Sequence, residues 1–124
     1  MTGESRKMTV LVIDDDRMVA DTLAEILRLN GFSPVALYSG EEAISFTERF
    51  QPDVVLSDIR MHRVDGIEAA RAIRQRHPEC RVILFTASTV NSKTKQAIQR
   101  SGFELLQRPL HPQSVLSALR QQSL

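Results

Sequence analysis

Two short apolar runs in this chain lead directly into carboxylates. Val10–Ile13 is followed at once by Asp14–Asp16, and Val54–Leu56 is followed by a single serine and then Asp58. Such β-branched runs are typical of strands that are buried on both faces of a parallel sheet. Open α/β sheets bind their ligands beyond the carboxyl ends of their strands. Clustered carboxylates repel one another unless they share a cation or a proton, so the pattern predicts a functional site.

The composition fits one globular domain without a charged bias toward one class of partner. The chain has 124 residues, 42% of them hydrophobic, and a net charge of +1. The overall charge therefore indicates no direct nucleic-acid binding and no membrane binding. The charges are unevenly distributed, because residues 1–79 hold 14 acids and 10 bases while residues 80–124 hold 1 acid and 6 bases. The basic part is either an ordinary solvated flank or a docking surface for an acidic partner.

The cysteine count and the hydropathy pattern restrict the location of the protein. Cys80 is the single cysteine, which excludes a disulfide framework and a zinc motif built from cysteines. No apolar run approaches the length needed to span a membrane, and residues 1–7 are too short and too polar for a signal peptide. We therefore expect a cytoplasmic protein, with residues 1–8 as a flexible leader.

Strands and helices are predicted to alternate along the whole chain. The strands are expected at residues 9–13, 33–38, 53–57, 81–85 and 104–107, and the helices at 17–30, 40–50, 66–76, 91–101 and from 112 onward. This alternation predicts an α/β fold with a doubly wound, five-stranded parallel sheet of the flavodoxin-like (βα)5 type. Right-handed crossovers then favour the strand order 2-1-3-4-5.

The sequence predicts specific packing for two of the helices. The second is expected to open at a capping box over residues 39–42 and to bury Ala43, Ile44, Thr47 and Phe50. The fourth has few apolar residues to bury and many short polar side chains, which compete for the backbone. It is therefore expected to be the most weakly packed helix.

The predicted strand order brings several polar residues to one edge of the sheet. Asp14, Asp15 and Asp58 converge there, because the first and third strands are neighbours. Thr86 ends the fourth strand and borders the same crevice. Arg108 follows the fifth strand, from where its side chain can reach over the crevice.

These motifs occur together in the order in which one protein family has them. They are Val-Ile before Asp14–Asp16, Leu-Ser-Asp58-Ile-Arg-Met with a later Asp65-Gly66, Phe-Thr86-Ala87, and Arg108-Pro109. The chain resembles the receiver domains of two-component response regulators, over residues 9–122. The starting methionine and the complete last helix are compatible with a stand-alone receiver.

The resemblance implies a function and a set of site residues. Asp58 would accept a phosphoryl group from a phosphohistidine of a sensor histidine kinase or a phosphotransfer protein. Mg²⁺ would be held by Asp15 and Asp58, by Asp14 largely through water, and by the backbone carbonyl of Arg60. Thr86 and Arg108 would contact the phosphoryl oxygens. The chain would be no enzyme beyond its own phosphorylation and dephosphorylation.

The weak packing expected of the fourth helix indicates how the signal leaves the domain, because a switching element needs low local stability. A downstream protein would bind the face formed by the fourth helix, the fifth strand and the last helix. Lys93, Lys95 and Arg100 are expected to be exposed on this face. Independent chemistry supports the phosphoryl acceptor, because Mg²⁺ prefers hard oxygen ligands and carboxylates can form acyl phosphates.

Three positions depart from the family pattern. Arg108 stands where lysine is usual, Leu105 where tyrosine or phenylalanine is common, and His62 where proline usually follows Met61. We expect His62 to loosen the loop after Asp58, and Arg108 to reach phosphate with a bulkier, differently shaped group.

Two alternative readings stay open at this point. A degenerate receiver would bind its partner without phosphorylation. A phosphatase of the haloacid-dehalogenase type would use Asp14 and Asp16 as its paired acids, although Met18 stands where that motif has threonine or valine.

Overall fold

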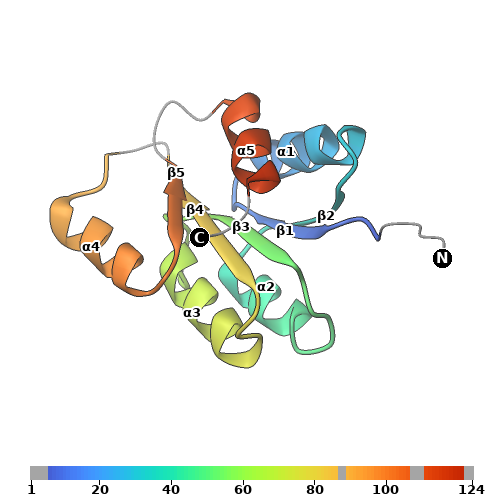
Figure 1. The fold of residues 1–124 in the computed structure, drawn as a ribbon. Helices are drawn as coiled ribbons and strands as arrows, with labels where there is room; N and C mark the ends of the chain where they lie inside the picture. The colour runs from blue at the N-terminus through green and yellow to red at the C-terminus, as the bar shows by residue number, and fades with distance from the viewer. Residues whose placement is uncertain (1–5, 87–88, 107–110, 122–124) are drawn as a thin grey trace.

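The sheet has the predicted number of strands and the predicted order. In the computed structural model, which describes residues 6–86, 89–106 and 111–121, all strand pairings are parallel. The strands are β1 Thr9–Ile13, β2 Ser33–Leu37, β3 Val54–Asp58, β4 Arg81–Phe85 and β5 Glu104–Leu106, and their order is β2-β1-β3-β4-β5. The predicted α/β fold class is confirmed (Figure 1).

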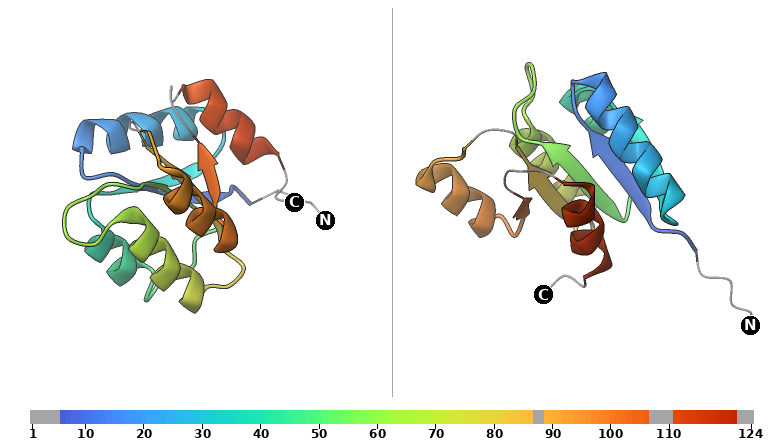
Figure 2. Two further views of the ribbon diagram at one scale, coloured as in Figure 1. Left: turned by 90° about the vertical axis from the view of Figure 1, so that its left-hand side faces the viewer. Right: turned by 90° about the horizontal axis from the view of Figure 1, so that it is seen from above.

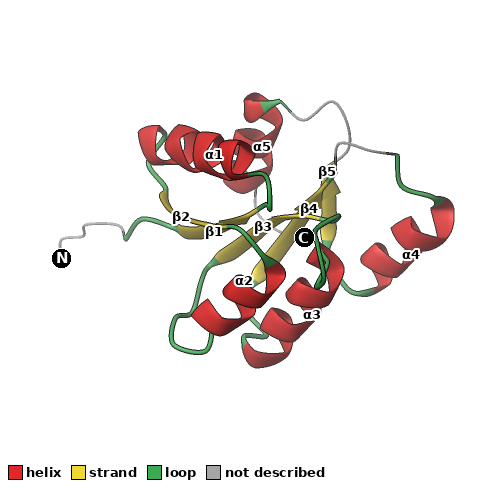
Figure 3. Ribbon diagram, turned by 180° about the vertical axis from the view of Figure 1, so that it is seen from behind, coloured by secondary structure: helices red, strands yellow, loops and turns green. Residues whose placement is uncertain are grey.

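In the described parts of the chain, five helices cover the two faces of this sheet. They are α1 Arg17–Leu29, α2 Gly40–Phe46, α3 Gly66–Arg76, α4 Ser92–Arg100 and α5 Pro112–Arg120. Helices α1 and α5 lie on one face, and α2, α3 and α4 lie on the other (Figures 1 and 3). The three-layer arrangement is also visible along two further directions (Figure 2). Because both faces are covered, the strands must be apolar on both sides.

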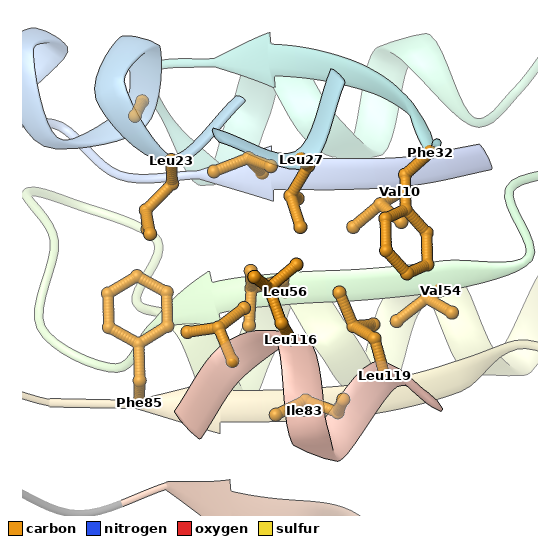
Figure 4. Close-up of a cluster of buried hydrophobic side chains, with 13 residues drawn as sticks. Val10, Leu23, Leu27, Phe32, Val54, Leu56, Ile83, Phe85, Leu116 and Leu119 are labelled. Carbon is orange, nitrogen blue, oxygen red and sulfur yellow. The ribbon is translucent and has the colours of Figure 1, made fainter. Parts of the chain in front are cut away.

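Alternate residues of each central strand enter two separate cores. Val10, Leu56 and Ile83 point toward α1 and α5, where they meet Leu27 and Leu116 (Figure 4). The residues next to them in sequence point the other way, toward α2, α3 and α4, and they include Leu11, Val55 and Leu84. Each fully buried leucine or isoleucine stabilises the fold by about 1.5–3 kcal/mol. This double burial holds the strand ends in fixed positions.

Side-chain caps begin the helices near the site. Asp16 caps α1 by accepting hydrogen bonds from the backbone N–H groups of Met18 and Val19. At α2 the Ser39 hydroxyl accepts from the Glu42 N–H group as predicted, but the Glu42 carboxylate accepts from Tyr38 N, so the expected capping box is only half formed. A complete capping box instead begins α3, at residues 65–68.

The sequence prediction was wrong about the end of the second helix. Helix α2 ends at Phe46, and the N–H groups of Glu48 and Arg49 then donate to carbonyls only three residues earlier. These tight turns move Phe50 off the buried face, and its side chain is 37% exposed beside the Phe46 ring. Thr47 and Ala43 are buried as predicted.

Helix α4 has the thin apolar face that was expected. Ile98 is the one buried residue among Ser92–Arg100, whereas α5 buries Val115, Leu116 and Leu119. Lys93, Lys95 and Arg100 are exposed, as predicted. Few apolar contacts and many solvent-exposed groups are the physical conditions for low local stability.

Candidate functional site

Three carboxylates meet at the carboxyl edge of the sheet. Strands β1 and β3 are paired with Ile13 opposite Ser57, so Asp14, just after β1, and Asp58, the last residue of β3, lie side by side. Asp14, Asp15 and Asp58 each offer one carboxylate oxygen, and these three atoms all lie within 4.8 Å of one another. The predicted convergence is confirmed. Among the described residues, this is the group of acids that is arranged to hold a metal ion.

Asp14 lies deepest in this cluster. It is 4% exposed, and burial is the main cause that raises its pKa to about 6. A hydrogen bond of 2.9 Å from the Asp16 N–H group opposes this shift, and the charges of Asp58 and Asp15 add to it. A carboxylate with such a pKa is ionised at neutral pH at a cost in free energy.

Asp58 is half-buried at the end of β3. Burial is again the first cause that raises its pKa, and the negative charge of Asp15 adds to it. The backbone N–H group of Arg60 donates to one of its oxygens at 3.3 Å, which lowers the pKa in part. Asp58 is therefore accessible, oriented and short of positive charge.

This donor set fits a hard divalent cation. A magnesium ion takes one or two carboxylates, keeps several waters and leaves room for phosphate oxygens. Asp15 and Asp58 would hold it, with Asp14 close by, and its charge would offset the burial and the neighbouring negative charges that raise the pKa of Asp14 and of Asp58. The contribution of the Arg60 carbonyl stays a prediction.

Of the two residues expected to contact the phosphoryl group, Thr86 is among the described residues and Arg108 is not. Thr86 directly follows β4, is 2% exposed and comes next to Phe85, whose carbonyl accepts a hydrogen bond of 2.9 Å from Ile59 N. This places Thr86 beside the residue that follows Asp58. Arg108 lies outside the described residues, so its role stays a prediction.

Two glycines hold the loop that joins β3 to α3. A Cβ atom on Gly66 would overlap the carbonyl oxygen of Asp58, so only glycine lets α3 begin so close to the acceptor strand. A Cβ atom on Gly40 would lie 2.7 Å from the Val64 carbonyl oxygen. Close approaches thus occur at Val64 within the β3–α3 loop and at Gly66, the first residue of α3. Nothing in the sequence near Gly40 indicated this contact.

His62 is the site residue that the sequence analysis misjudged. Its ring Nδ1 lies 2.7 Å from Asp15 Oδ2, and its backbone N–H group donates to the same oxygen at 3.2 Å. The expectation that His62 loosens the loop is therefore wrong, because the histidine joins the loop to the acidic cluster. The two residues are 47 positions apart in sequence, and no local pattern connects them.

The position of Asp16 argues against the phosphatase reading. Its side chain accepts hydrogen bonds from the first turn of α1, at 3.1 Å from Met18 N and 3.3 Å from Val19 N. It is therefore engaged as a helix cap and is not the partner of Asp14 in a pair of catalytic acids.

Comparison with known proteins agrees with the fold and with the order of the motifs. Residues 10–120 match the family described as the response regulator receiver domain. The response regulator MprA of Mycobacterium avium is 29% identical over 113 residues, which are 91% of this chain and 50% of that protein. The chain thus spans about half the length of the curated relatives it matches.

Solved structures show the same fold. The chemotaxis protein CheY4 of Vibrio cholerae superposes with a TM-score of 0.84 at 24% identity, covering 93% of this chain and 98% of that one. A CheY-like receiver domain from Methanospirillum hungatei superposes with a TM-score of 0.87 at 19% identity, covering 93% of this chain and 92% of that one.

No helix in the described ranges is long and apolar enough to cross a bilayer.

The match over nearly the whole chain identifies the class of protein. The chain belongs to the response regulator receiver domain family.

Proposed function

We propose that this receiver domain is switched by phosphorylation of Asp58, with Mg²⁺ held by Asp15, Asp58 and the Arg60 carbonyl, and by Asp14 largely through water. The donor is a phosphohistidine of a sensor histidine kinase or of a phosphotransfer protein in the cytoplasm. The observation that carries the proposal is the cluster of three carboxylates, one buried and two half-buried, whose ligand atoms lie within 4.8 Å of one another. A purely structural role would leave these charges paired.

The side chains around Asp58 have separate roles in this transfer. An Asp58 oxygen bonds to phosphorus as the bond from phosphorus to the donor imidazole breaks, and the imidazole takes up a proton. Bound Mg²⁺ supplies charge neutralisation for the phosphoryl oxygens. The Arg60 N–H group, at 3.3 Å, orients the Asp58 carboxylate. Thr86 and Arg108 donate hydrogen bonds to the transferred group.

The signal leaves through the face formed by α4, β5 and α5. A contact between Thr86 and the phosphoryl group would draw the start of the β4–α4 segment toward Asp58. Helix α4 can respond because it is attached mainly through Ile98, and half-buried Leu105 on neighbouring β5 can move with it. The exposed cations Lys93, Lys95 and Arg100 make this face suited to an acidic partner protein.

The acceptor is tested by incubation with acetyl phosphate and Mg²⁺, followed by intact-mass analysis. We expect one phosphoryl adduct in the natural chain and none in Asp58→Asn. Asp53→Asn is the matched control, because Asp53 lies just before the other end of the same strand. If the natural chain binds Mg²⁺ but gains no adduct, it is a degenerate receiver, and Leu105 and His62 become the first residues to exchange for the common ones.

The output face is tested by hydrogen exchange with and without beryllofluoride and Mg²⁺. We expect protection to change in residues 89–106 as well as around Asp58. A change confined to the surroundings of Asp58 would contradict the proposed route.

A further inference from the structure

The two ends of α4 are attached to the rest of the domain in different ways. At the carboxyl end, Ile98 is fully buried, and Phe103, just beyond the helix, is 6% exposed in the same core. At the amino end, half-buried Val90 packs against this core, while Asn91 and Ser92 are exposed. The carboxyl end lies close to β5 and α3, and the amino end points away from the sheet (Figures 1 and 2). The helix is therefore anchored mainly at its carboxyl end.

Backbone hydrogen bonds fix the geometry of this anchored end. The N–H groups of Gly102 and Phe103 donate to the carbonyls of Gln99 and Ile98 at 3.0 and 3.2 Å. Gly102 has a φ of +77°, in the left-handed region. This is the Schellman arrangement, in which a glycine closes the helix and the next residue makes an apolar contact with the last turn. The turn into β5 thus has a defined shape.

Arg74 of α3 contacts the same turn. Its guanidinium carbon lies 5.2 Å from the centre of the Phe103 ring, within the range of a cation–π contact. A Cβ atom on Gly102 would lie 3.6 Å from Arg74 Nη1, so the guanidinium also lies beside the backbone of the turn. The buried Nε atom of Arg74 has no hydrogen-bond partner among the described residues. The Phe103 ring and the turn therefore determine where the guanidinium lies.

The amino end of α4 is closed by residues that belong to the helix itself. The Asn91 side chain accepts a hydrogen bond of 2.8 Å from the Thr94 N–H group and caps the first turn. Cap and helix can change direction together without losing this bond. A helix of nine residues is about 13 Å long, so a tilt of about 10° about its carboxyl end moves its amino end by about 2 Å.

We propose that Arg74 is a positioning residue that makes the carboxyl end of α4 a pivot, about which the switch tilts the helix. The amino end, which carries exposed Lys93 and Lys95, then moves, while Arg100 stays nearly in place. The inference rests on the proposed phosphorylation switch and adds the direction of its movement. An acidic partner distinguishes the two states through Lys93 and Lys95, whereas Arg100 contributes about equally to both.

The test measures distances between two nitroxide labels by pulsed electron paramagnetic resonance. One label is attached at Thr22→Cys, an exposed position of α1, and the other at either Lys93→Cys or Arg100→Cys. Cys80 is buried and should stay unlabelled, which intact mass checks. Each pair is measured without and with beryllofluoride and Mg²⁺.

The same label pairs are measured with Arg74→Ala and with a matched control. Arg71→Ala is the control, because Arg71 is an exposed arginine on the same helix. Arg74→Lys is the second variant, in case Arg74→Ala does not fold. It keeps the charge and a long stem but loses the flat guanidinium that lies over the ring.

In the natural chain we expect beryllofluoride to shift the distance to the Lys93 label by about 2 Å and the distance to the Arg100 label by less than about 1 Å. Arg74→Ala should broaden the distances to the Arg100 label and let both labels shift by similar amounts. Arg74→Lys should have the same effect to a smaller degree, and Arg71→Ala should behave as the natural chain. A merely structural Arg74 would change the stability without changing which end moves.

The outcomes separate this inference from the proposed function. Equal shifts of both labels in the natural chain overturn the pivot. An unchanged difference between the two labels in the Arg74 variants overturns the role of Arg74. If Asp58 gains a phosphoryl group but neither label moves, only this inference fails. If Asp58 gains none, the proposed function fails and the inference with it.

Discussion

Charged side chains at the two ends of the sheet lie in opposite electrostatic surroundings. At the amino end, Asp53 immediately precedes β3 and forms two hydrogen bonds with Arg6 at 2.9 and 3.0 Å, while it also accepts from Thr9 N at 2.8 Å. The Arg6 guanidinium lowers the pKa of Asp53. At the carboxyl end, Asp58 closes the same strand among other acids, and burial raises its pKa.

Strand β4 shows the same contrast. At its amino end the Arg81 guanidinium binds the Glu104 carboxylate at 2.6 and 2.7 Å and also donates to the carbonyls of Ala118 and Gln121 near the end of α5. At its carboxyl end it leads into buried Thr86, next to Phe85, whose carbonyl accepts from the Ile59 N–H group. Charges that stabilise the fold are paired with opposite charges, whereas Asp14 and Asp58 are buried or half-buried among other acids, which raises the pKa of both.

Among the variants that test this contrast between the two ends of the sheet, Arg81→Ala should have the largest effect on the free energy of unfolding. It removes a paired charge at the amino end. The Arg81 side chain is 13% exposed, and its loss leaves Glu104 and two carbonyls without their donor. We expect the free energy of unfolding to fall by about 2–4 kcal/mol, measured by urea denaturation. Arg120→Ala is the control, since Arg120 is exposed and makes one contact of 3.4 Å. Equal effects of the two variants would show that Arg81 is not a structural clamp.

Asp14→Asn, at the unpaired end, should act in the opposite direction. The folded pKa of Asp14 is about 6 against an ordinary value of 3.8, so the folded state binds more protons than the unfolded state between these values. Stability is therefore lost as the pH rises through this window, and the asparagine removes that loss.

For Asp14→Asn we expect a gain of about 1–3 kcal/mol in the free energy of unfolding at pH 7.5, which fades toward pH 4. Asp16→Asn should be nearly neutral, because asparagine also caps helices well. Added Mg²⁺ should narrow the difference between the natural chain and Asp14→Asn. A destabilised Asp14→Asn at pH 7.5 would contradict the conclusion that the buried charge of Asp14 costs stability.

Asp53→Asn should give the smallest effect and the opposite dependence on pH. Because the folded pKa of Asp53 is lowered, its contribution is present above the unfolded value and is lost as the pH falls through the folded value. The variant should therefore be slightly less stable at pH 7.5 and equal to the natural chain in strong acid. The Arg6 side chain is 74% exposed, so the difference should also shrink in high salt. Thermal unfolding across pH and salt measures both trends.

Local sequence patterns were sufficient for most of the elements. The bounds of β1, α3 and β4 agree with the prediction, because apolar runs, a helix-capping Asp65 and a Pro78 stop signal act within a few residues. The predicted end of α2 was wrong because two tight turns place Phe50 at the surface. No residue at 47–50 indicates these turns clearly.

The sequence by itself determined the class of fold and the identity of the three acids. Strand alternation decides that β1 and β3 are neighbours, and the acids that follow them must then meet. Only the tertiary structure decided which charged side chains meet a partner. His62 and Asp15, or Arg81 and the carbonyls of α5, are far apart in sequence and meet through loop paths and strand register. Such contacts depend on the positions of whole elements, which local propensity does not encode.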